Sequence, residues 1–227
     1  MNPEGFTHLI INGCSFAYAE NVDYVDKWYT KLAKDTGLVP VVLAKPGAGN
    51  DRIFRTTAEY AFKKSYMPRY VFNPLFIIAF SQAERREEFN PVENCPEGVY
   101  MPDPDNYHKS SDFSKAIFNA SSTNEGLIFN LHRKYLHWFN TTNLLKTLNY
   151  SYLVSDYFTE KNDYVNSEIL VRHPELMHAI QSDPNKLADF DSVTSGYEPL
   201  PCGHDGPEAQ QYLTEYIHSQ YIKRFVK

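Results

Sequence analysis

Two short segments place a serine and a histidine in surroundings suited to nucleophilic catalysis. Ser15 lies in GCSF at 13–16, directly after an apolar run at 7–13. A serine in a glycine-containing turn between a strand and a helix exposes its hydroxyl, and nearby backbone N–H groups can face an oxyanion. His204 lies in CGHDGP at 202–207, just before a predicted helix, where a histidine suits general base catalysis. Taken singly, a capping serine and a loop histidine without a partner are the commoner interpretations.

Polar and glycine-rich loops follow the next two predicted strands. Gly47 and Asn50 lie in a PGAGN segment, in which glycine allows close approach of a ligand to the backbone and asparagine can donate a hydrogen bond or cap a helix. Ser81 and Gln82 supply a hydroxyl and an amide, and Arg85 can bind a carboxylate or phosphate. A plain tight turn and a solvated charged face explain these segments equally well.

The elements that must position these residues alternate between strands and helices. Apolar runs predict strands, helical spacing predicts helices, and Gly37 is placed to end one of them. This βαβ pattern predicts an α/β fold, with a mostly parallel central sheet between two layers of helices. The predicted strands are 7–13, 39–44, 75–80 and 150–154, and the predicted helices are 23–36, 51–66, 127–148 and 206–225.

The length favours one domain over residues 1–227, because domains typically hold roughly 100–200 residues. The segment at about 86–126 is rich in Pro, Asn, Asp and Ser and shows no sustained period, so we expect an insertion or a long surface excursion there. A second polar stretch, at 156–198, has only weak helix signals. The aromatic content of 15% divides into expected core residues and loop tyrosines that could line a cleft or an interface. The former include Trp28 and Trp138, and the latter include Tyr100, Tyr107 and Tyr197.

Charge and hydropathy disfavour several classes of partner. The net charge of −6 offers no broad basic surface, so we expect no nucleic-acid partner. We expect no membrane partner either, since there is no apolar run of about 18 residues. We also expect no signal peptide. The three cysteines, Cys14, Cys95 and Cys202, share no ligand spacing, which disfavours a disulfide framework and a zinc site.

The order of these segments resembles the SGNH (GDSL-like) hydrolase family, in particular the variety found in bacteriophage genomes. The matching blocks are GCSF at 13–16, GAGNDRIFR at 47–55, AFSQAERRE at 79–87 and CGHDGPEA at 202–209. The resemblance implies a flavodoxin-like α/β/α sandwich and an ester hydrolase that needs no cofactor or metal. It makes Ser15 the nucleophile, His204 the base, and the backbone N–H groups of Gly47 and Ser15 the oxyanion donors.

Two positions depart from the family pattern. The asparagine of its third block is absent, so Ser81, Gln82 or Asn50 must substitute. The family's aspartate three residues before the histidine is Pro201 here. A Ser–His dyad can work alone, but a third group normally fixes the tautomer and orientation of the histidine. Asp205, Asp191, Asp189 or a backbone carbonyl are the alternatives for that role.

Two functions from different classes remain open. The first is hydrolysis of a small-molecule or glycan ester, with an acylated carbohydrate as the candidate substrate that the aromatic loops would suit. The second is a catalytically impaired SGNH-like module in a phage virion or its assembly, alone or as a homo-oligomer, placed in the host cytoplasm or the virion. Nucleotide binding is disfavoured because neither a P-loop nor GxGxxG is present. A metal site built from His8, His204 and Asp205 lacks ligand spacing.

Overall fold

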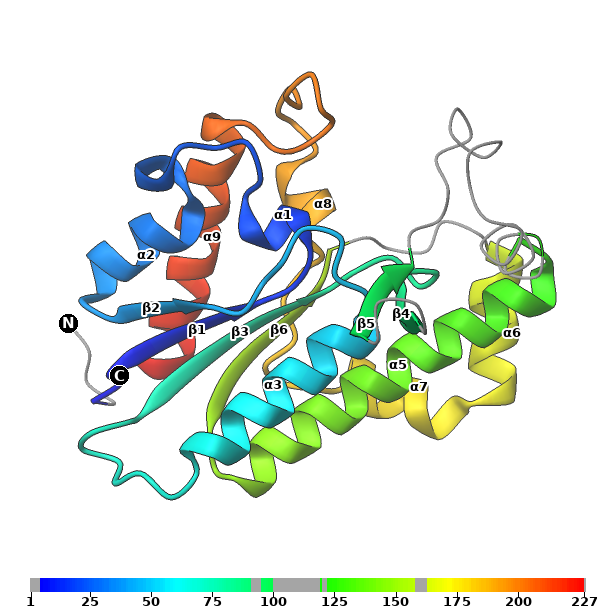
Figure 1. The fold of residues 1–227 in the computed structure, drawn as a ribbon, viewed down its shortest axis with the longest axis horizontal. Coiled ribbons are helices and arrows are strands. Elements are labelled where there is room, and N and C mark those ends of the chain that lie inside the picture. Colours follow the sequence, from blue (N-terminus) through cyan, green and yellow to red (C-terminus); the bar gives the residue numbers. More distant parts are fainter. Residues whose placement is uncertain (1–4, 91–94, 100–118, 120–121, 158–162, 227) are drawn as a thin grey trace.

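A four-stranded parallel sheet forms the centre of the computed structural model, which describes residues 5–90, 95–99, 119, 122–157 and 163–226. The strand order is β2-β1-β3-β6, and all three pairings are parallel (Figure 1). The strands are β1 (His8–Asn12), β2 (Val39–Val42), β3 (Pro74–Phe80) and β6 (Ser151–Asp156).

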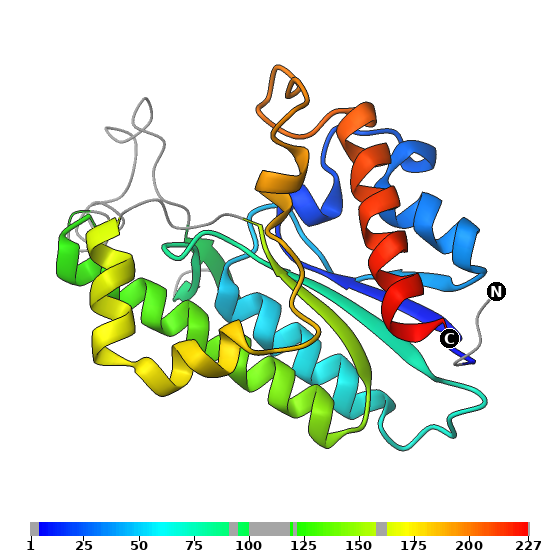
Figure 2. The ribbon, with the colours of Figure 1, turned by 180° about the vertical axis from the view of Figure 1, so that it is seen from behind.

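Helices cover both faces of the sheet, as Figures 1 and 2 show from opposite sides. The helices α2 (Trp28–Thr36) and α9 (Pro207–Phe225) pack together on one face, and α3 (Asn50–Lys64) and α5 (Asn124–Thr147) on the other. Shorter helices are α1 (Ser15–Tyr18), a 3-10 helix (Tyr24–Asp26), α6 (Asp163–Arg172), α7 (Pro174–Gln181) and α8 (Phe190–Thr194). Within the ranges that the structure describes, no helix is long and apolar enough to cross a membrane.

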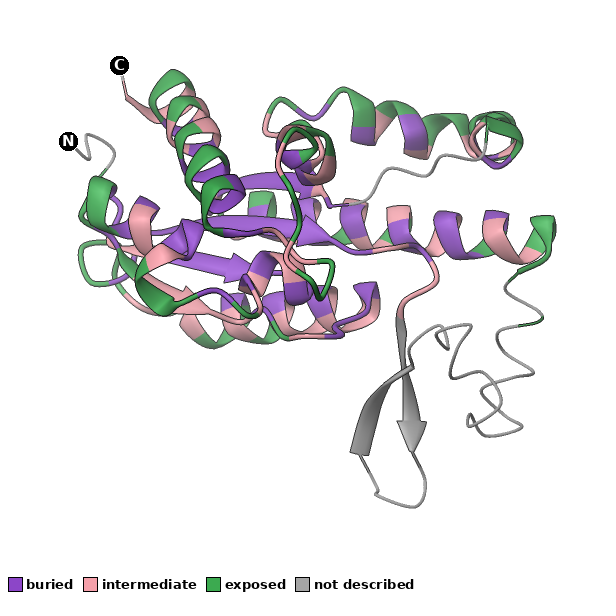
Figure 3. Ribbon diagram, turned by 90° about the horizontal axis from the view of Figure 1, so that it is seen from above, coloured by how far each residue is buried: buried purple, intermediate pink, exposed green. Residues whose placement is uncertain are grey.

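The core follows from the continuous hydrophobicity of the inner strands. All seven residues of β3 are buried, as expected for a strand covered on both faces. Because side chains alternate along a strand, Ile77 faces the α2/α9 layer and Ile78 faces the α3/α5 layer. Trp28 and Trp138, 0% and 1% exposed, fill the two sides as predicted. Figure 3 shows the buried strands lying between helices whose exposed residues face outward.

The predicted α/β/α class is confirmed, and the differences lie in the polar segments. A two-stranded antiparallel hairpin, β4 (Arg86–Asn90) and β5 (Cys95–Val99), occupies the start of the expected excursion. Such a hairpin depends on pairing between segments, and strands containing Pro and Gly carry little intrinsic β signal. The polar stretch after β6 contains α6, α7 and α8. Tyr100 and Tyr107 lie outside the described residues.

The strand order creates a topological switch point at the carboxyl ends of β1 and β3. The chain leaves β1 toward β2 on one side and leaves β3 toward β6 on the other, so the two following loops diverge. Such a switch point is where open α/β sheets bind ligands.

Candidate active site

Ser15 begins the one-turn helix α1, directly beyond the end of β1 at the switch point. The turn that leads to it has no room for a side chain at Gly13: a Cβ there would lie 2.4 Å from Ala17 Cβ and 2.8 Å from the Ala79 carbonyl oxygen. The backbone before Ser15 therefore packs directly against the end of β3. Ser15 itself is 5% exposed.

Helix α1 ends in a Schellman motif. Ala19 adopts a left-handed conformation with φ of 54°, and its N–H donates to the carbonyl oxygen of Phe16. The N–H of Glu20 donates to the carbonyl oxygen of Ser15 at 3.0 Å. These two bonds define the motif and return the chain to the level of Ser15. Glu20 is thus held close to the candidate nucleophile.

His204 lies in a tight turn that brings its ring to α1. The N–H of Leu200 donates to the His204 carbonyl oxygen at 2.7 Å, and Gly203 has φ of 80°. The His204 and Phe16 rings pack with centroids 4.6 Å apart, and Phe16 is the residue after Ser15. Neither ring nitrogen of His204 makes a hydrogen bond to a described residue.

The acids near His204 have separate surroundings. The Asp205 carboxylate accepts a hydrogen bond from the hydroxyl of Tyr157, the residue directly after β6. Burial raises the pKa of the Asp205 carboxyl and nearby Asp191 adds to that rise, whereas the Tyr157 hydroxyl and His204 oppose it. The backbone N–H of Asp191 donates to the Tyr157 carbonyl oxygen at 3.1 Å. Asp205 and Asp191 therefore gather around Tyr157, and Glu20 is the acid whose carboxylate contacts the His204 ring, at 3.4 Å from Nε2.

The loop after β2 lies against the turn before Ser15. The N–H of Lys45 donates to the Gly13 carbonyl oxygen at 3.2 Å, and the N–H of Ala48 donates to the Lys45 carbonyl oxygen. Pro46 and Gly47 are the central residues of this turn, and the φ of 75° at Gly47 is typical of the third position of a type II turn. The structure thus brings Gly47 to the same edge as Ser15, while its role as an oxyanion donor stays a prediction.

Asn50 joins the loops that follow β2 and β3. Its Nδ2 donates to the Gln82 carbonyl oxygen at 2.9 Å and to that of Ser81 at 3.4 Å, and its Oδ1 accepts the Ser81 N–H at 2.8 Å. The helix N-cap is Gly49 instead of the expected Asn50. Both ends of the Asn50 amide are engaged within the protein.

The loop after β3 holds the remaining predicted side chains. The Ser81 hydroxyl is buried and makes no hydrogen bond to a described residue, whereas both ends of the Asn50 amide do. The Gln82 Oε1 atom accepts a hydrogen bond from Arg85 Nε at 3.1 Å. Gln82 and Arg85 therefore pair with each other in this loop.

Comparison with known proteins rests on solved structures, because no protein-family model and no curated protein matches the sequence. The psychrotrophic esterase EstA from Pseudoalteromonas sp. aligns over 96% of this chain and 97% of its own, with TM-score 0.55 and 9% identity. A member of the lipolytic protein G-D-S-L family from Veillonella parvula aligns over 97% and 99%, with TM-score 0.51 and 10% identity. The chain has the fold of the G-D-S-L esterases.

A third structure, the acetyl xylan esterase Est2A from Butyrivibrio proteoclasticus, aligns over 96% of this chain but 64% of its own, with TM-score 0.51 and 11% identity. The expected SGNH-type sandwich is thereby confirmed as a fold.

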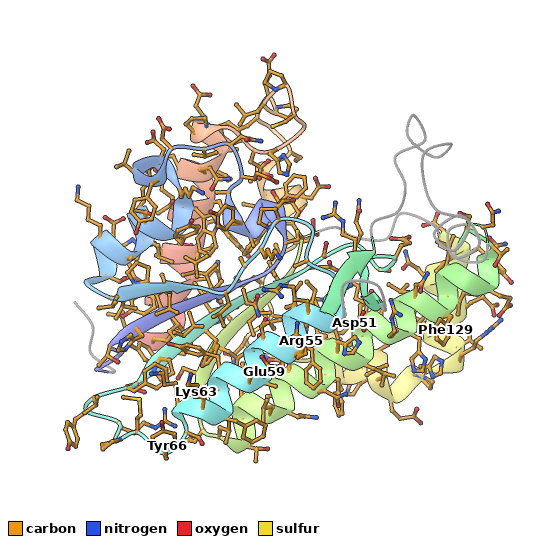
Figure 4. All side chains as sticks on the ribbon, viewed as in Figure 1. Asp51, Arg55, Glu59, Lys63, Tyr66 and Phe129 are labelled. Carbon is orange, nitrogen blue, oxygen red and sulfur yellow. The ribbon has the colours of Figure 1, made fainter. Side chains whose placement is uncertain are left out.

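Three polar residues that the sequence analysis did not single out, Asn12, Asp51 and His137, stabilise the structure around the candidate site. Asn12, a polar residue in an apolar strand, donates to the Ile53 carbonyl oxygen and accepts the Gly13 N–H. Asp51, labelled in Figure 4, lies 2.7 Å from His137 Nε2 and fastens the start of α3 to α5. The polar type of Asn12 within its strand was the only available signal.

His8 argues against the metal site weighed from the sequence. It opens β1, whereas His204 lies beyond the opposite end of that strand. Among the described side chains, no cluster of three or more His, Cys, Asp or Glu residues is arranged to hold a metal ion.

Proposed function

We propose that this protein hydrolyses an ester, with Ser15 as nucleophile and His204 as general base. Ser15 Oγ attacks the ester carbonyl carbon while its proton passes to His204, which returns it to the departing alcohol. Water then attacks the acyl-enzyme and loses a proton to His204. His204 returns that proton to Ser15 Oγ as the bond between Oγ and the acyl carbon breaks, which releases the carboxylic acid and restores the Ser15 hydroxyl.

One observation carries the proposal: the ring of His204 packs on Phe16, the residue next to Ser15. The two segments come from far apart in the chain, and they meet at the carboxyl edge of the sheet beside the switch point. A nucleophile and a base at this edge are the minimum that acyl transfer requires.

Oxyanion stabilisation is assigned to the N–H groups of Ser15 and Gly47, with the Ser81 hydroxyl as the side-chain donor. The Ser81 hydroxyl suits this role because it is buried without a hydrogen bond to the described residues, and preorganised donors act most strongly where water is excluded. For the substrate we propose an acyl ester of a carbohydrate. The likeness to an acetyl xylan esterase supports that class.

Hydrolysis of p-nitrophenyl acetate and butyrate tests the reaction. We expect activity in the wild type and in Ser195→Ala, an exposed control serine, and a loss of roughly 100-fold or more in Ser15→Ala and His204→Gln. A fluorophosphonate probe should label the wild type and the control but not Ser15→Ala. Equal rates in the wild type and Ser15→Ala would refute the proposal. Acetylated xylo-oligosaccharides, compared with simple alkyl esters, test the substrate class.

The second candidate is a non-catalytic role in a phage particle or its assembly. The observation in its favour is a group of exposed aromatic side chains near the end of α3, where Figure 4 labels Tyr66. Phe62, Tyr66 and Tyr70 are 57%, 78% and 86% exposed, and aromatic residues are enriched at protein interfaces. Co-purification with particles, or a defined oligomer in size-exclusion chromatography, together with an unreactive Ser15, would favour this candidate.

A further inference from the structure

The acid that contacts His204 comes from the segment of the nucleophile, not from the segment of the base. Glu20 Oε2 lies 3.4 Å from His204 Nε2, which is the separation of an ion pair, without a hydrogen bond. The two side chains are 35% and 17% exposed. Because both side chains are partly shielded from water, the attraction between Glu20 and His204 is stronger than that of a fully exposed pair.

The backbone fixes where Glu20 can reach. Its N–H is bonded to the Ser15 carbonyl oxygen, and the left-handed Ala19 turns the chain back toward the start of α1. Residues other than glycine rarely adopt this left-handed conformation. The surrounding structure therefore holds the turn in this conformation, and this fixes the point at which the Glu20 side chain leaves the backbone.

The His204 ring is constrained on two sides by this arrangement. Phe16 packs on its face with an interplanar angle of 38°, and Glu20 lies at the edge that carries Nε2. The neighbouring Asp205 carboxylate is engaged by the Tyr157 hydroxyl. Glu20 is thus the carboxylate placed to select which ring nitrogen carries the proton.

We propose that Glu20 is the positioning residue for His204, supplying from the turn after α1 the carboxylate that the loop before α9 lacks at Pro201. The Glu20 carboxylate stabilises the proton on His204 Nε2. The lone pair then resides on Nδ1, which accepts the Ser15 proton. In hydrolases with a Ser–His–acid triad, the acid fixes the tautomer in this manner. The inference rests on the proposed function of Ser15 and His204.

Steady-state kinetics of three variants tests this role. Glu20→Ala and Glu20→Gln should lower kcat on p-nitrophenyl acetate by roughly 10- to 100-fold, less than the loss of a fully buried triad acid, with KM within about twofold. Glu198→Gln, an exposed acid in the loop before His204, serves as the matched control and should retain wild-type kcat. Added formate should partly restore kcat in Glu20→Ala, which a purely structural role would not allow. Unchanged kcat in both Glu20 variants would overturn the inference.

A spectroscopic measurement separates this inference from the proposed function. Long-range ¹⁵N NMR of the full chain reports the protonation pattern of the His204 ring without any substrate. We expect the His204 signals to move in Glu20→Gln and to stay in Glu198→Gln, and identical signals in all three proteins would overturn the role of Glu20. If the wild type and Ser15→Ala hydrolyse esters equally, the proposed function fails, and the NMR result still decides the Glu20 contact.

Discussion

Asn50 Oδ1 accepts a hydrogen bond from the Ser81 backbone N–H at 2.8 Å, across the gap between the loops that follow β2 and β3. The same side chain donates to the Gln82 carbonyl oxygen at 2.9 Å. One amide therefore holds together the two loops assigned to oxyanion stabilisation, at a side chain that is 2% exposed.

Replacing Asn50 by alanine should destabilise the fold and impair the site together. The change leaves the buried Ser81 N–H without its partner, at about 1–3 kcal/mol for an unsatisfied buried group. It also removes one of two hydrogen bonds to the Gln82 carbonyl oxygen, which keeps the one from the Arg85 N–H. We expect a free energy of unfolding lower by about 2–4 kcal/mol in urea titrations, and a lower kcat. Arg55→Ala, at a side chain on the same helix that is 39% exposed, should change stability by less than about 0.5 kcal/mol. Wild-type stability in Asn50→Ala would contradict the role of this side chain.

Adding a single methyl group before Ser15 should be strongly disruptive. In Gly13→Ala the new Cβ would meet Ala17 Cβ at 2.4 Å and the Ala79 backbone oxygen at 2.8 Å, and neither atom belongs to a flexible side chain. We expect a loss of about 3 kcal/mol or more, or failure to fold, measured by thermal unfolding. Gly196→Ala is the matched control, since a Cβ there has nothing within 4 Å. Equal melting temperatures for the two variants would argue against this packing.

The buried ion pair between α5 and β6 offers a test of the fold near the site. Lys134 Nζ lies 2.6 Å from Asp156 Oδ1, with side chains 1% and 13% exposed. Lys134→Met leaves a mostly buried carboxylate without this cation, so we expect a loss of about 3 kcal/mol. The double variant Lys134→Met/Asp156→Leu should recover part of that loss. A double variant as unstable as the sum of the single ones would show that the pair does not couple.

Stability should fall in mild acid because of stacked histidines. The His132 and His173 rings lie 3.6 Å apart and nearly parallel, and burial, followed by the charge of His173, lowers the pKa of His132. A base whose pKa is lowered by folding binds more protons when unfolded, so its contribution is present above about pH 6.5 and is lost as the pH falls below it.

Urea midpoints at pH 8 and pH 5.5 measure this effect. The decrease between the two pH values should be smaller in His132→Gln than in the wild type. His218→Gln, on α9, is the control and should keep the wild-type decrease. An equal decrease in His132→Gln and the wild type would exclude His132 as the source.

The packing of His204 on Phe16, the residue after Ser15, agrees with a general rule that the sequence analysis used: ligands bind in open α/β sheets at the edge where the carboxyl ends of the strands lie. The order of strands and helices followed from runs such as LFIIAF, whose continuous hydrophobicity indicates a strand covered on both faces. The end of α2 at Gly37, which is left-handed, could likewise be predicted from the residue type.

Contacts that depend on local backbone geometry or on distant loops were not predictable. Glu20 reaches His204 only because Ala19, a residue with no preference for left-handed conformation, closes α1. The sequence predicts that Asn50 is a cap or a ligand donor, since nothing in it shows that the partners of Asn50 follow β3. The hairpin of β4 and β5 depends on pairing between two segments with weak strand propensity.

The packing of His204 on Phe16 also bears on the order of events during synthesis. The ribosome releases the segment of Ser15 long before that of His204, and the rings can meet only once α9 has docked beside α2. A nascent chain therefore carries the proposed nucleophile, Ser15, before it carries the proposed base, His204. Any chemistry at this edge of the sheet that needs both segments must wait until α9 has packed beside α2.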